Sequence, residues 1–404
     1  MIKKALFLIL LLQFVFINVN HAQGTEEKIN KVRLSWEISP RAVYYQVVIL
    51  KSELDTPENI EVVFNKVFNN GIEIGLSHKP DAKNLYYKVC PLNYDGMPIE
   101  KFSKPRPIVS GEINTNSPKP IALLGKDEDA PLYPVYSWIP MLGEKNYEVE
   151  VYRKREKNQL IHILRTNSNS LYEKAGFTYP DTYFWRVRAI SLTGKPTSDW
   201  SENTTFIVKK GVKIAALGDS ITHGGGAISV PPSSPIYRYE AYADIEIKNL
   251  GRSGDKTEDM LNRFEKDVLP FHPQILLIMG GVNDIREGIS PTVTINNLAA
   301  IKNMCAKNGI IPVFVTTTPI NPDLTWRSLT RTDLPDDYAR ILRTINNWIM
   351  NQQYAIDVTS SLCGDNLYLY AGLTTDGIHP DHIAKERMGK IIAEYIKKTF
   401  PNMY

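Results

Sequence analysis

The sequence is poor in cysteine and histidine, and neither residue type forms a cluster. Three cysteines in 404 residues are too few for a disulfide scaffold and lack metal-ligand spacing. We expect Cys90, Cys305 and Cys363 to be buried thiols, with a Cys305–Cys363 disulfide as the less favoured alternative. The seven histidines have no clustered partner ligands. The sequence therefore predicts no metal site and no cofactor.

The chain also lacks a strong charge of either sign. Its formal net charge is +3, and without residues 1–22 it has 45 basic against 44 acidic side chains, a net charge of +1. Binding to nucleic acid or to an anionic membrane surface generally requires an excess of basic side chains. We therefore expect no nucleic-acid partner.

Only one long apolar run is present, from Ala5 to Val19, behind Lys3 and Lys4. Its length, about 15 residues, is short of the roughly 20 that span a bilayer, and a basic flank is typical of a secretory signal peptide. Residues 1–22 are therefore predicted to be a signal peptide, and the mature protein is expected to be secreted or periplasmic. No cysteine follows the run, so we expect no lipoprotein anchor. No later stretch is apolar for long enough to cross a membrane, so we expect no transmembrane anchor.

The first half of the chain contains an internal repeat. Trp36 and Trp138 are each followed nine residues later by a tyrosine, and Tyr86–Val89 matches Phe184–Val187 at an offset of 98. Both units alternate apolar and polar residues in short runs that Pro, Asn, Asp and Gly interrupt, as half-buried antiparallel strands do. The pattern predicts two β sandwiches in tandem.

These units resemble fibronectin type III modules, and we place them at residues 27–113 and 114–209. In such a module, Trp36 and Trp138 occupy the core of an early strand. A role as sugar platforms is the alternative, but a tryptophan in an alternating strand usually faces the core. Neither unit clusters catalytic residue types, so we expect spacing, support of the next domain, or weak glycan or protein contacts.

After residue 210 the pattern changes to strands that alternate with helices, which predicts a parallel sheet covered by helices on both faces. Five strands suit a three-layer flavodoxin-like domain, with its site at the carboxyl ends of the strands. The predicted strands are Ile214–Leu217, Glu246–Leu250, Ile275–Met279, Ile311–Thr316 and Tyr354–Asp357, and the predicted helices are Lys256–Phe264, Thr292–Lys307, Asp336–Asn351 and Ile383–Phe400.

Four segments at such strand ends carry chemically useful groups. Ser220 follows the first strand, Gly254 the second, Asn283 the third, and Asp376 and His379 precede the last helix. Each has an ordinary structural alternative: a helix cap for Ser220 or Asn283, a turn glycine for Gly254, an exposed loop histidine for His379. Together they supply a hydroxyl nucleophile, a base, a carboxylate that orients the base, and oxyanion donors, which is what acyl transfer requires.

Residues 213–400 resemble the SGNH (GDSL) hydrolase family, and we place the catalytic domain at residues 210–404. The resemblance rests on Gly218–Ile221, Gly254, Gly281–Asp284 and Asp376–Pro380. It implies that Ser220 is the nucleophile, His379 the base and Asp376 the residue that orients His379. It also implies an oxyanion hole formed by the Ser220 N–H, the Gly254 N–H and the Asn283 side chain.

The rim of this site is expected in residues 224–242 and 319–337, which contain aromatic rings among polar residues and no continuous apolar run. Such rings suit stacking on a sugar face, although packing beneath the loops is the alternative. His223 is expected to contact substrate at the rim or solvent, since no carboxylate is spaced to orient it as a base. The predicted rim residues are His223, Tyr237, Tyr239 and Trp326.

The leading hypothesis is a secreted serine esterase that removes short acyl groups from carbohydrate. Acetyl is the favoured acyl group. The expected partner is an acylated small molecule or carbohydrate. A lipid-directed acylhydrolase, resembling a lysophospholipase or thioesterase, is the enzymatic alternative. A non-catalytic adhesion or binding protein is the alternative from another class.

Overall fold

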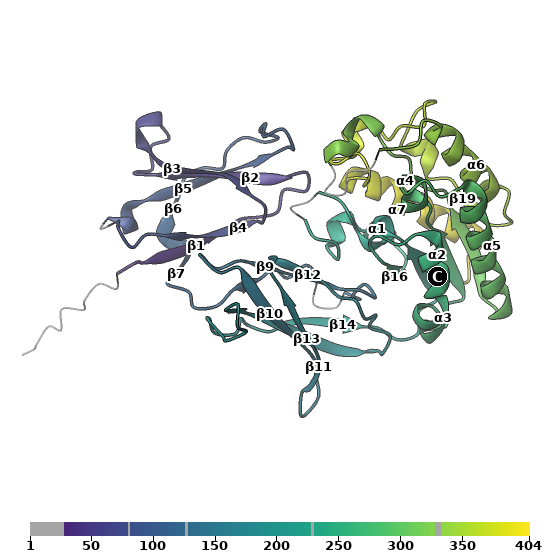
Figure 1. Cartoon of the computed structure of the whole chain (residues 1–404), viewed down its shortest axis with the longest axis horizontal. Helices are drawn as coiled ribbons and strands as arrows, with labels where there is room; N and C mark the ends of the chain where they lie inside the picture. Colours follow the sequence, from purple (N-terminus) through teal and green to yellow (C-terminus); the bar gives the residue numbers. More distant parts are fainter. Residues whose placement is uncertain (1–27, 80, 126–127, 228–229, 328–332) are drawn as a thin grey trace, which may run out of the picture.

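A computed structural model describes residues 28–79, 81–125, 128–227, 230–327 and 333–404. Two β domains are followed by an α/β domain that holds the other half of the chain (Figure 1). The predicted signal peptide lies outside the described residues. Among the helices that are described, none has the length and apolarity needed to cross a membrane.

The first β domain is a sandwich of two antiparallel sheets. One sheet has the order β4-β1-β7 and the other the order β3-β2-β5-β6. Trp36 directly follows β1, packs on the core and meets Tyr45 edge-on at 5.3 Å between ring centroids. The strands are β1 (Lys31–Ser35), β2 (Tyr44–Leu50), β3 (Ile60–Val67), β4 (Gly71–Gly75), β5 (Tyr86–Leu92), β6 (Arg106–Pro107) and β7 (Glu112–Ile113).

The second β domain is also formed by two antiparallel sheets, β12-β9-β8 and β11-β10-β13-β14. Trp138 is completely buried in its core, as the sequence predicts. The tandem of antiparallel β domains is therefore confirmed, and the fibronectin type III identity stays a prediction. The strands are β8 (Lys119–Pro120), β9 (Val135–Ile139), β10 (Asn146–Arg153), β11 (Gln159–Thr166), β12 (Ser170–Tyr172), β13 (Asp181–Ile190) and β14 (Thr204–Val208).

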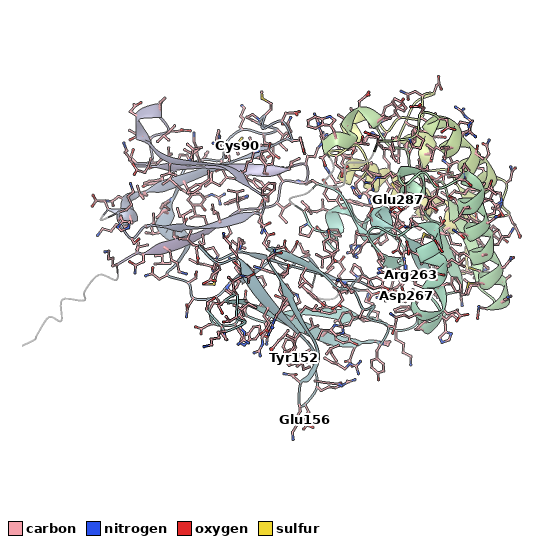
Figure 2. The ribbon with its side chains drawn as sticks, in the orientation of Figure 1. Cys90, Tyr152, Glu156, Arg263, Asp267 and Glu287 are labelled. Atoms are coloured by element: carbon pink, nitrogen blue, oxygen red, sulfur yellow. The ribbon has the colours of Figure 1, made fainter. Side chains whose placement is uncertain are left out.

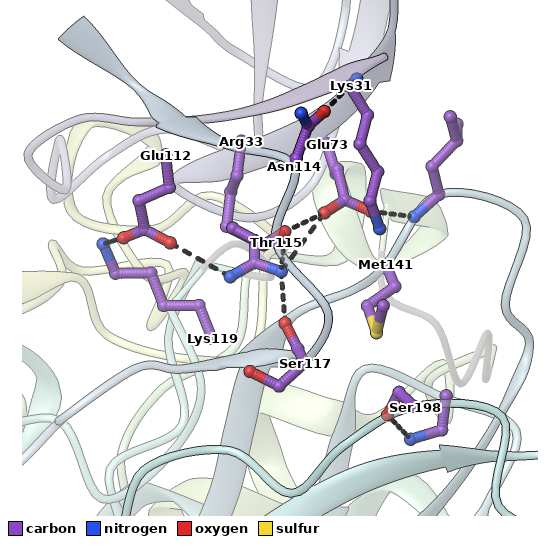
Figure 3. Close-up of polar contacts among 12 residues, drawn as sticks. Lys31, Arg33, Glu73, Glu112, Asn114, Thr115, Ser117, Lys119, Met141 and Ser198 are labelled. Atoms are coloured by element: carbon purple, nitrogen blue, oxygen red, sulfur yellow. Dashed lines mark hydrogen bonds and ion pairs between the residues drawn. The ribbon is translucent and has the colours of Figure 1, made fainter. Parts of the chain in front are cut away.

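A buried ion pair lies at the junction of the two β domains (Figure 3). Arg33 on β1 donates to Glu73 on β4 at 3.3 Å and to Thr115 in the connecting segment at 2.9 Å. Glu73 in turn accepts the backbone N–H of Leu142 in the second domain at 2.7 Å. The buried Glu73 carboxylate, which also pairs with Lys31, therefore connects the first β domain to the second.

The α/β domain contains a parallel sheet of order β16-β15-β17-β18-β19. In chain order this is 2-1-3-4-5, the flavodoxin-like arrangement that the strand-helix alternation predicts. Every residue of β15 and β17 is buried, since helices and loops cover the central strands. The strands are β15 (Ile214–Gly218), β16 (Lys248–Gly251), β17 (Ile275–Met279), β18 (Ile311–Val315) and β19 (Ala355–Ile356).

The helices of this domain pack in two groups. In one group, α5 contacts both α2 and α6. In the other, α7 packs against the short 3-10 helices η4 (Pro235–Tyr237) and η5 (Tyr239–Tyr242). The three long helices predicted from the sequence are confirmed to within about two residues at each end. The α-helices are α1 (Ser220–His223), α2 (Thr257–Asn262), α3 (Phe264–Asp267), α4 (Val282–Arg286), α5 (Pro291–Lys307), α6 (Tyr338–Met350) and α7 (His382–Thr399).

The second β domain covers the edge of the parallel sheet. The Leu132 N–H donates to the Asn249 carbonyl of edge strand β16 at 2.9 Å. The Tyr133 hydroxyl donates to Asp267, which also accepts from Arg263, and both charged residues lie on the side of the α/β domain that faces this β domain (Figure 2). One backbone carbonyl at the edge of the sheet is thereby paired within the chain.

The first β domain contacts loops of the α/β domain. Tyr237 donates its hydroxyl hydrogen to the Pro40 carbonyl. Tyr94 meets Trp326 edge-on, with ring centroids 5.1 Å apart, next to an ion pair of 2.7 Å between Asp95 and Arg327. Trp326 and Arg327 end the 3-10 helix η7 (Pro322–Arg327). Two loops of this β domain therefore reach the segments in which the sequence places the rim.

All three cysteines are free and buried, as expected, so the alternative Cys305–Cys363 disulfide is not formed. Figure 2 labels Cys90 in the first β domain. Within the described ranges, no group of three or more His, Cys, Asp or Glu side chains is placed to hold a metal ion.

Candidate active site

Ser220 lies in a sharp turn between β15 and α1. Gly218 has no room for a side chain, because a Cβ atom there would lie 2.1 Å from Thr222 Oγ1 and 2.7 Å from the Met279 carbonyl oxygen. Asp219 caps the helix, since its Oδ1 accepts the Ile221 N–H at 2.8 Å. Ser220 is thus the first residue of a helix of only four residues, at the carboxyl end of a central strand.

The structure brings Ser220, His379 and Asp376 into one hydrogen-bonded chain. His379 Nε2 lies 2.9 Å from Ser220 Oγ, and its Nδ1 lies 2.7 Å from Asp376 Oδ2. Since a carboxylate only accepts, Nδ1 carries the hydrogen and Nε2 faces the serine as an acceptor. Residues 159 positions apart in the chain therefore have the geometry of a nucleophile, a base and the group that orients the base.

Asp376 is held as a charged acceptor. Its Oδ1 accepts the backbone N–H groups of Ile378 and His379, both at 2.9 Å. Burial alone would raise its pKa, but the charge of His379 and these hydrogen bonds outweigh burial and hold the pKa of Asp376 below its usual value. The carboxylate therefore stays ionised and can stabilise a protonated His379.

Gly225 leaves the space that the His379 ring occupies. A Cβ atom at position 225 would lie 2.7 Å from His379 Cδ2 and 2.9 Å from Nε2. The glycine run from Gly224 to Gly226 is visible in the sequence, but the contact with a residue more than 150 positions away is not. Gly225 is thus a site residue that the sequence analysis did not identify.

Gly254 lies in a tight turn after β16. Its φ of +90° is a left-handed conformation that favours glycine. The start of this turn is held by the Arg252 N–H, which donates to the Gly218 carbonyl at 3.0 Å. Among the described residues, no backbone hydrogen bond involves the Gly254 N–H. Its positive φ, and not a close approach of its missing side chain, is why glycine is needed here.

Asn283 is the second residue of α4, which follows strand β17, and it is 6% exposed. One N–H of its amide donates to the Asp255 carbonyl at 2.9 Å, and its Oδ1 accepts from Arg286 at 3.0 Å. These two bonds fix which end of the amide carries the hydrogens. The second N–H of Nδ2 takes part in neither of these two bonds.

Two buried ionisable groups lie beneath Ser220, and the sequence analysis identified neither as part of the site. Burial raises the pKa of Asp219 to about 6 and lowers the pKa of Lys385 to about 7. Lys385 donates to the Ile221 carbonyl, so α7 supports the short helix that carries Ser220. A signal for Lys385 exists in the sequence, because it falls on the buried face of α7 between Ala384 and Met388.

The predicted rim is largely wrong. Tyr237 and Tyr239 are completely buried, because η4 and η5 pack against α7 and the Tyr237 hydroxyl bonds to the Pro40 carbonyl of the first β domain. His223 is 1% exposed, since its ring lies between the Tyr133 carbonyl and Ser253. Aromatic residues among polar ones suggest a surface in the sequence, whereas Tyr237 and Tyr239 form the packing beneath the loops. Trp326 alone of the four predicted rim residues is exposed, at 47%.

The part of the chain that holds this site matches a known family model. Residues 216–385 match the model of the GDSL-like lipase/acylhydrolase family. The chain is 33% identical over 118 residues to an uncharacterised lipoprotein, YqeF, of Bacillus subtilis (strain 168), a match that covers 26% of this chain and 49% of that protein. The chain thus spans about half the length of this curated relative.

Solved structures resemble the α/β domain. One is a GDSL-like lipase of Bacteroides thetaiotaomicron VPI-5482, with 22% identity over 46% of this chain and 88% of that chain and a TM-score of 0.39. Another is the lipase/acylhydrolase of Enterococcus faecalis, with 24% identity over 46% of this chain and 96% of that chain and a TM-score of 0.37. Similarity at this level carries no information about substrate.

Proposed function

We propose that the protein is a serine esterase that hydrolyses esters of short acyl groups, with acetyl as the favoured group. The proposal starts from the match of residues 216–385 to the GDSL-like lipase/acylhydrolase family model. The observation that carries the proposal is the hydrogen-bonded chain from Ser220 through His379 to Asp376. No single residue of the three supports acyl transfer by itself, and the support for the proposal is their joint geometry.

In this mechanism Ser220 Oγ attacks the ester carbonyl carbon while His379 Nε2 accepts the hydroxyl proton. Asp376 stabilises the imidazolium that forms. The tetrahedral intermediate then collapses, His379 returns the proton to the leaving alkoxide, and the alcohol departs. A water molecule, deprotonated by His379, hydrolyses the acyl-enzyme and releases the carboxylic acid and free Ser220.

The negative charge on the intermediate needs donors that are in place before the reaction. We assign this role to the Ser220 N–H, the Gly254 N–H and the second N–H of Asn283 Nδ2. In support, Gly254 is held in a positive-φ turn and the Asn283 amide is oriented by Asp255 and Arg286.

Carbohydrate is the proposed alcohol portion of the substrate. The support is Trp326, an exposed ring that meets Tyr94 of the first β domain next to the ion pair between Arg327 and Asp95. The Trp326 segment is continuous with the site, since the Asn321 N–H donates to the Gly377 carbonyl at 2.7 Å. Aromatic faces beside charged groups suit a sugar ring, which stacks through C–H groups and hydrogen-bonds through hydroxyls.

A series of p-nitrophenyl esters, acetate to octanoate, tests the acyl preference. We expect kcat/KM to be highest for acetate or propionate and to fall by octanoate. In an acyl-chain channel, each buried CH₂ would contribute about 0.8 kcal/mol, or roughly fourfold in kcat/KM. A steady rise with chain length would overturn the short-chain proposal in favour of a lipid-directed acylhydrolase.

We also propose that the protein is exported. The support is the apolar run behind Lys3 and Lys4, together with the curated relative that is called a lipoprotein. Amino-terminal sequencing of the protein purified from the producing cells tests this: a start near Gln23 is expected, and a retained Met1 would contradict export through a cleaved signal peptide.

A further inference from the structure

His223 joins the second β domain to the proposed oxyanion hole. It is the last residue of α1, three positions after Ser220, and its ring is buried. Its Nε2 lies 2.6 Å from the Tyr133 carbonyl oxygen, and its Nδ1 lies 2.8 Å from Ser253 Oγ. Ser253 directly precedes Gly254. One ring thus contacts two segments that are 120 residues apart in the chain.

The direction of both hydrogen bonds follows from the partners. A carbonyl oxygen only accepts, so Nε2 carries the hydrogen and donates to Tyr133. Burial lowers the pKa of His223 to about 4, and Arg263 and Lys385 disfavour its charge further, so the ring is neutral. A neutral ring with hydrogen on Nε2 has a lone pair on Nδ1. Ser253 therefore donates its hydroxyl hydrogen to His223.

The turn from Arg252 to Asp255 is held at each end by other bonds. The Arg252 N–H donates to the Gly218 carbonyl at 3.0 Å, and the Asp255 carbonyl accepts from Asn283 at 2.9 Å. Between these ends, the Ser253 side chain provides the bond to His223. This bond therefore acts on the apex of the turn, where the Gly254 N–H lies.

The Tyr133 carbonyl is itself fixed by its neighbours. The Leu132 N–H donates to Asn249 on β16 at 2.9 Å, the Leu132 carbonyl accepts from Phe177 at 2.9 Å, and the Tyr133 hydroxyl donates to Asp267 at 2.6 Å. Because both the strand edge and the second β domain hold this segment, the anchor for His223 does not move independently of the sheet.

We propose that His223 is a positioning residue: anchored by the Tyr133 carbonyl of the second β domain, it accepts the Ser253 hydroxyl and so fixes the Gly254 N–H for the oxyanion. This inference rests on the proposed function, and it gives the second β domain a part in catalysis. Donors for an oxyanion act only when they are already in place, so loosening one lowers kcat more than it raises KM.

Two substitutions remove this bond from opposite sides. Ser253→Ala removes the donor, and His223→Gln keeps an N–H for Tyr133 at the position of Nε2 while removing the Nδ1 acceptor. With p-nitrophenyl acetate, we expect each to lower kcat about tenfold with KM within about twofold of wild type. The double variant should be no worse than either single variant, since both remove one interaction. Ser253→Thr, which keeps a hydroxyl, should recover most of the kcat.

The matched control is Ser198→Ala in the second β domain, which removes a serine hydroxyl that accepts the Ala189 N–H at 2.8 Å. It should leave kcat unchanged, and unfolding temperatures of all variants separate loss of stability from loss of catalysis. An inactive wild-type protein would refute the proposed function. An active wild type with unchanged kcat in Ser253→Ala and His223→Gln, or with additive losses in the double variant, would overturn the positioning role alone.

Discussion

Gly225 and the ring of His379 lie so close that a Cβ atom at position 225 would come within 2.7 Å of His379 Cδ2. The Gly225 N–H also donates to the Ser220 carbonyl at 2.7 Å. The serine turn and the histidine turn are therefore packed against each other through a position that tolerates no side chain.

Gly225→Ala should displace the His379 ring and lower kcat by about 10- to 100-fold, since a displacement of about 1 Å in a catalytic group can cost about 10² in rate. Steady-state kinetics with p-nitrophenyl acetate measures this. Gly364→Ala is the control, because its Cβ atom would make only an ordinary contact of 3.5 Å with the Tyr370 hydroxyl. Wild-type kcat in Gly225→Ala would show that this close contact does not position the base.

Asn283→Ala should lower kcat by about 10² to 10³ with little change in KM, because the amide donor acts mainly on charge that forms in the transition state. Asn308→Ala is the control, since that exposed side chain donates to the Met304 carbonyl at the end of α5. An effect confined to KM would show that Asn283 binds the substrate instead of the oxyanion.

Asp219 should make stability depend on pH. Burial raises its pKa from 3.8 to about 6, so the folded protein binds this proton more tightly than the unfolded chain. Its contribution favours folding below about pH 4 and is lost as the pH rises through 6, a change of up to about 3 kcal/mol.

Asp219→Asn keeps an acceptor for the Ile221 N–H but cannot ionise. Relative to wild type, its free energy of unfolding should therefore increase by up to about 3 kcal/mol between pH 4 and pH 7, as measured by urea titration at each pH. A difference between the two proteins that stays constant over this range would show that Asp219 ionises with its usual pKa.

Trp326→Ala and Tyr94→Ala should each lower kcat/KM on acetylated oligosaccharides about 2- to 12-fold, the equivalent of about 0.5–1.5 kcal/mol for an aromatic contact. Activity on p-nitrophenyl acetate, which has no sugar, should stay unchanged. Tyr179→Ala, which removes an exposed ring in the second β domain, is the control. Equal losses on both substrates would contradict a sugar-binding role for this pair.

The periodic features of the chain could be predicted from the sequence. Continuous apolar strands such as Ile275–Met279 and long helices such as Pro291–Lys307 have local patterns that packing does not override. The order of Ser220, Gly254, Asn283, Asp376 and His379 along the chain predicts a common site, because the carboxyl ends of parallel strands meet at one edge.

Burial in the loops could not be predicted, because it depends on contacts between distant segments. Tyr237 and Tyr239 look like rim residues in the sequence, yet the first β domain and α7 cover them. His223 was expected at the surface for the same reason: nothing in its neighbourhood in the sequence indicates that the Tyr133 carbonyl, 90 residues earlier, is its partner.

The most direct test of the account is Ser220→Ala, assayed with p-nitrophenyl acetate and with a fluorophosphonate probe on protein whose unfolding temperature matches that of wild type. Loss of a triad nucleophile typically costs on the order of 10⁶ in rate. We predict that wild type reacts covalently with the probe at Ser220, and that the variant is unlabelled and has no measurable activity. A variant that keeps more than about a hundredth of the wild-type kcat, or a folded wild type that does not react with the probe, would contradict the assignment of Ser220 as the nucleophile.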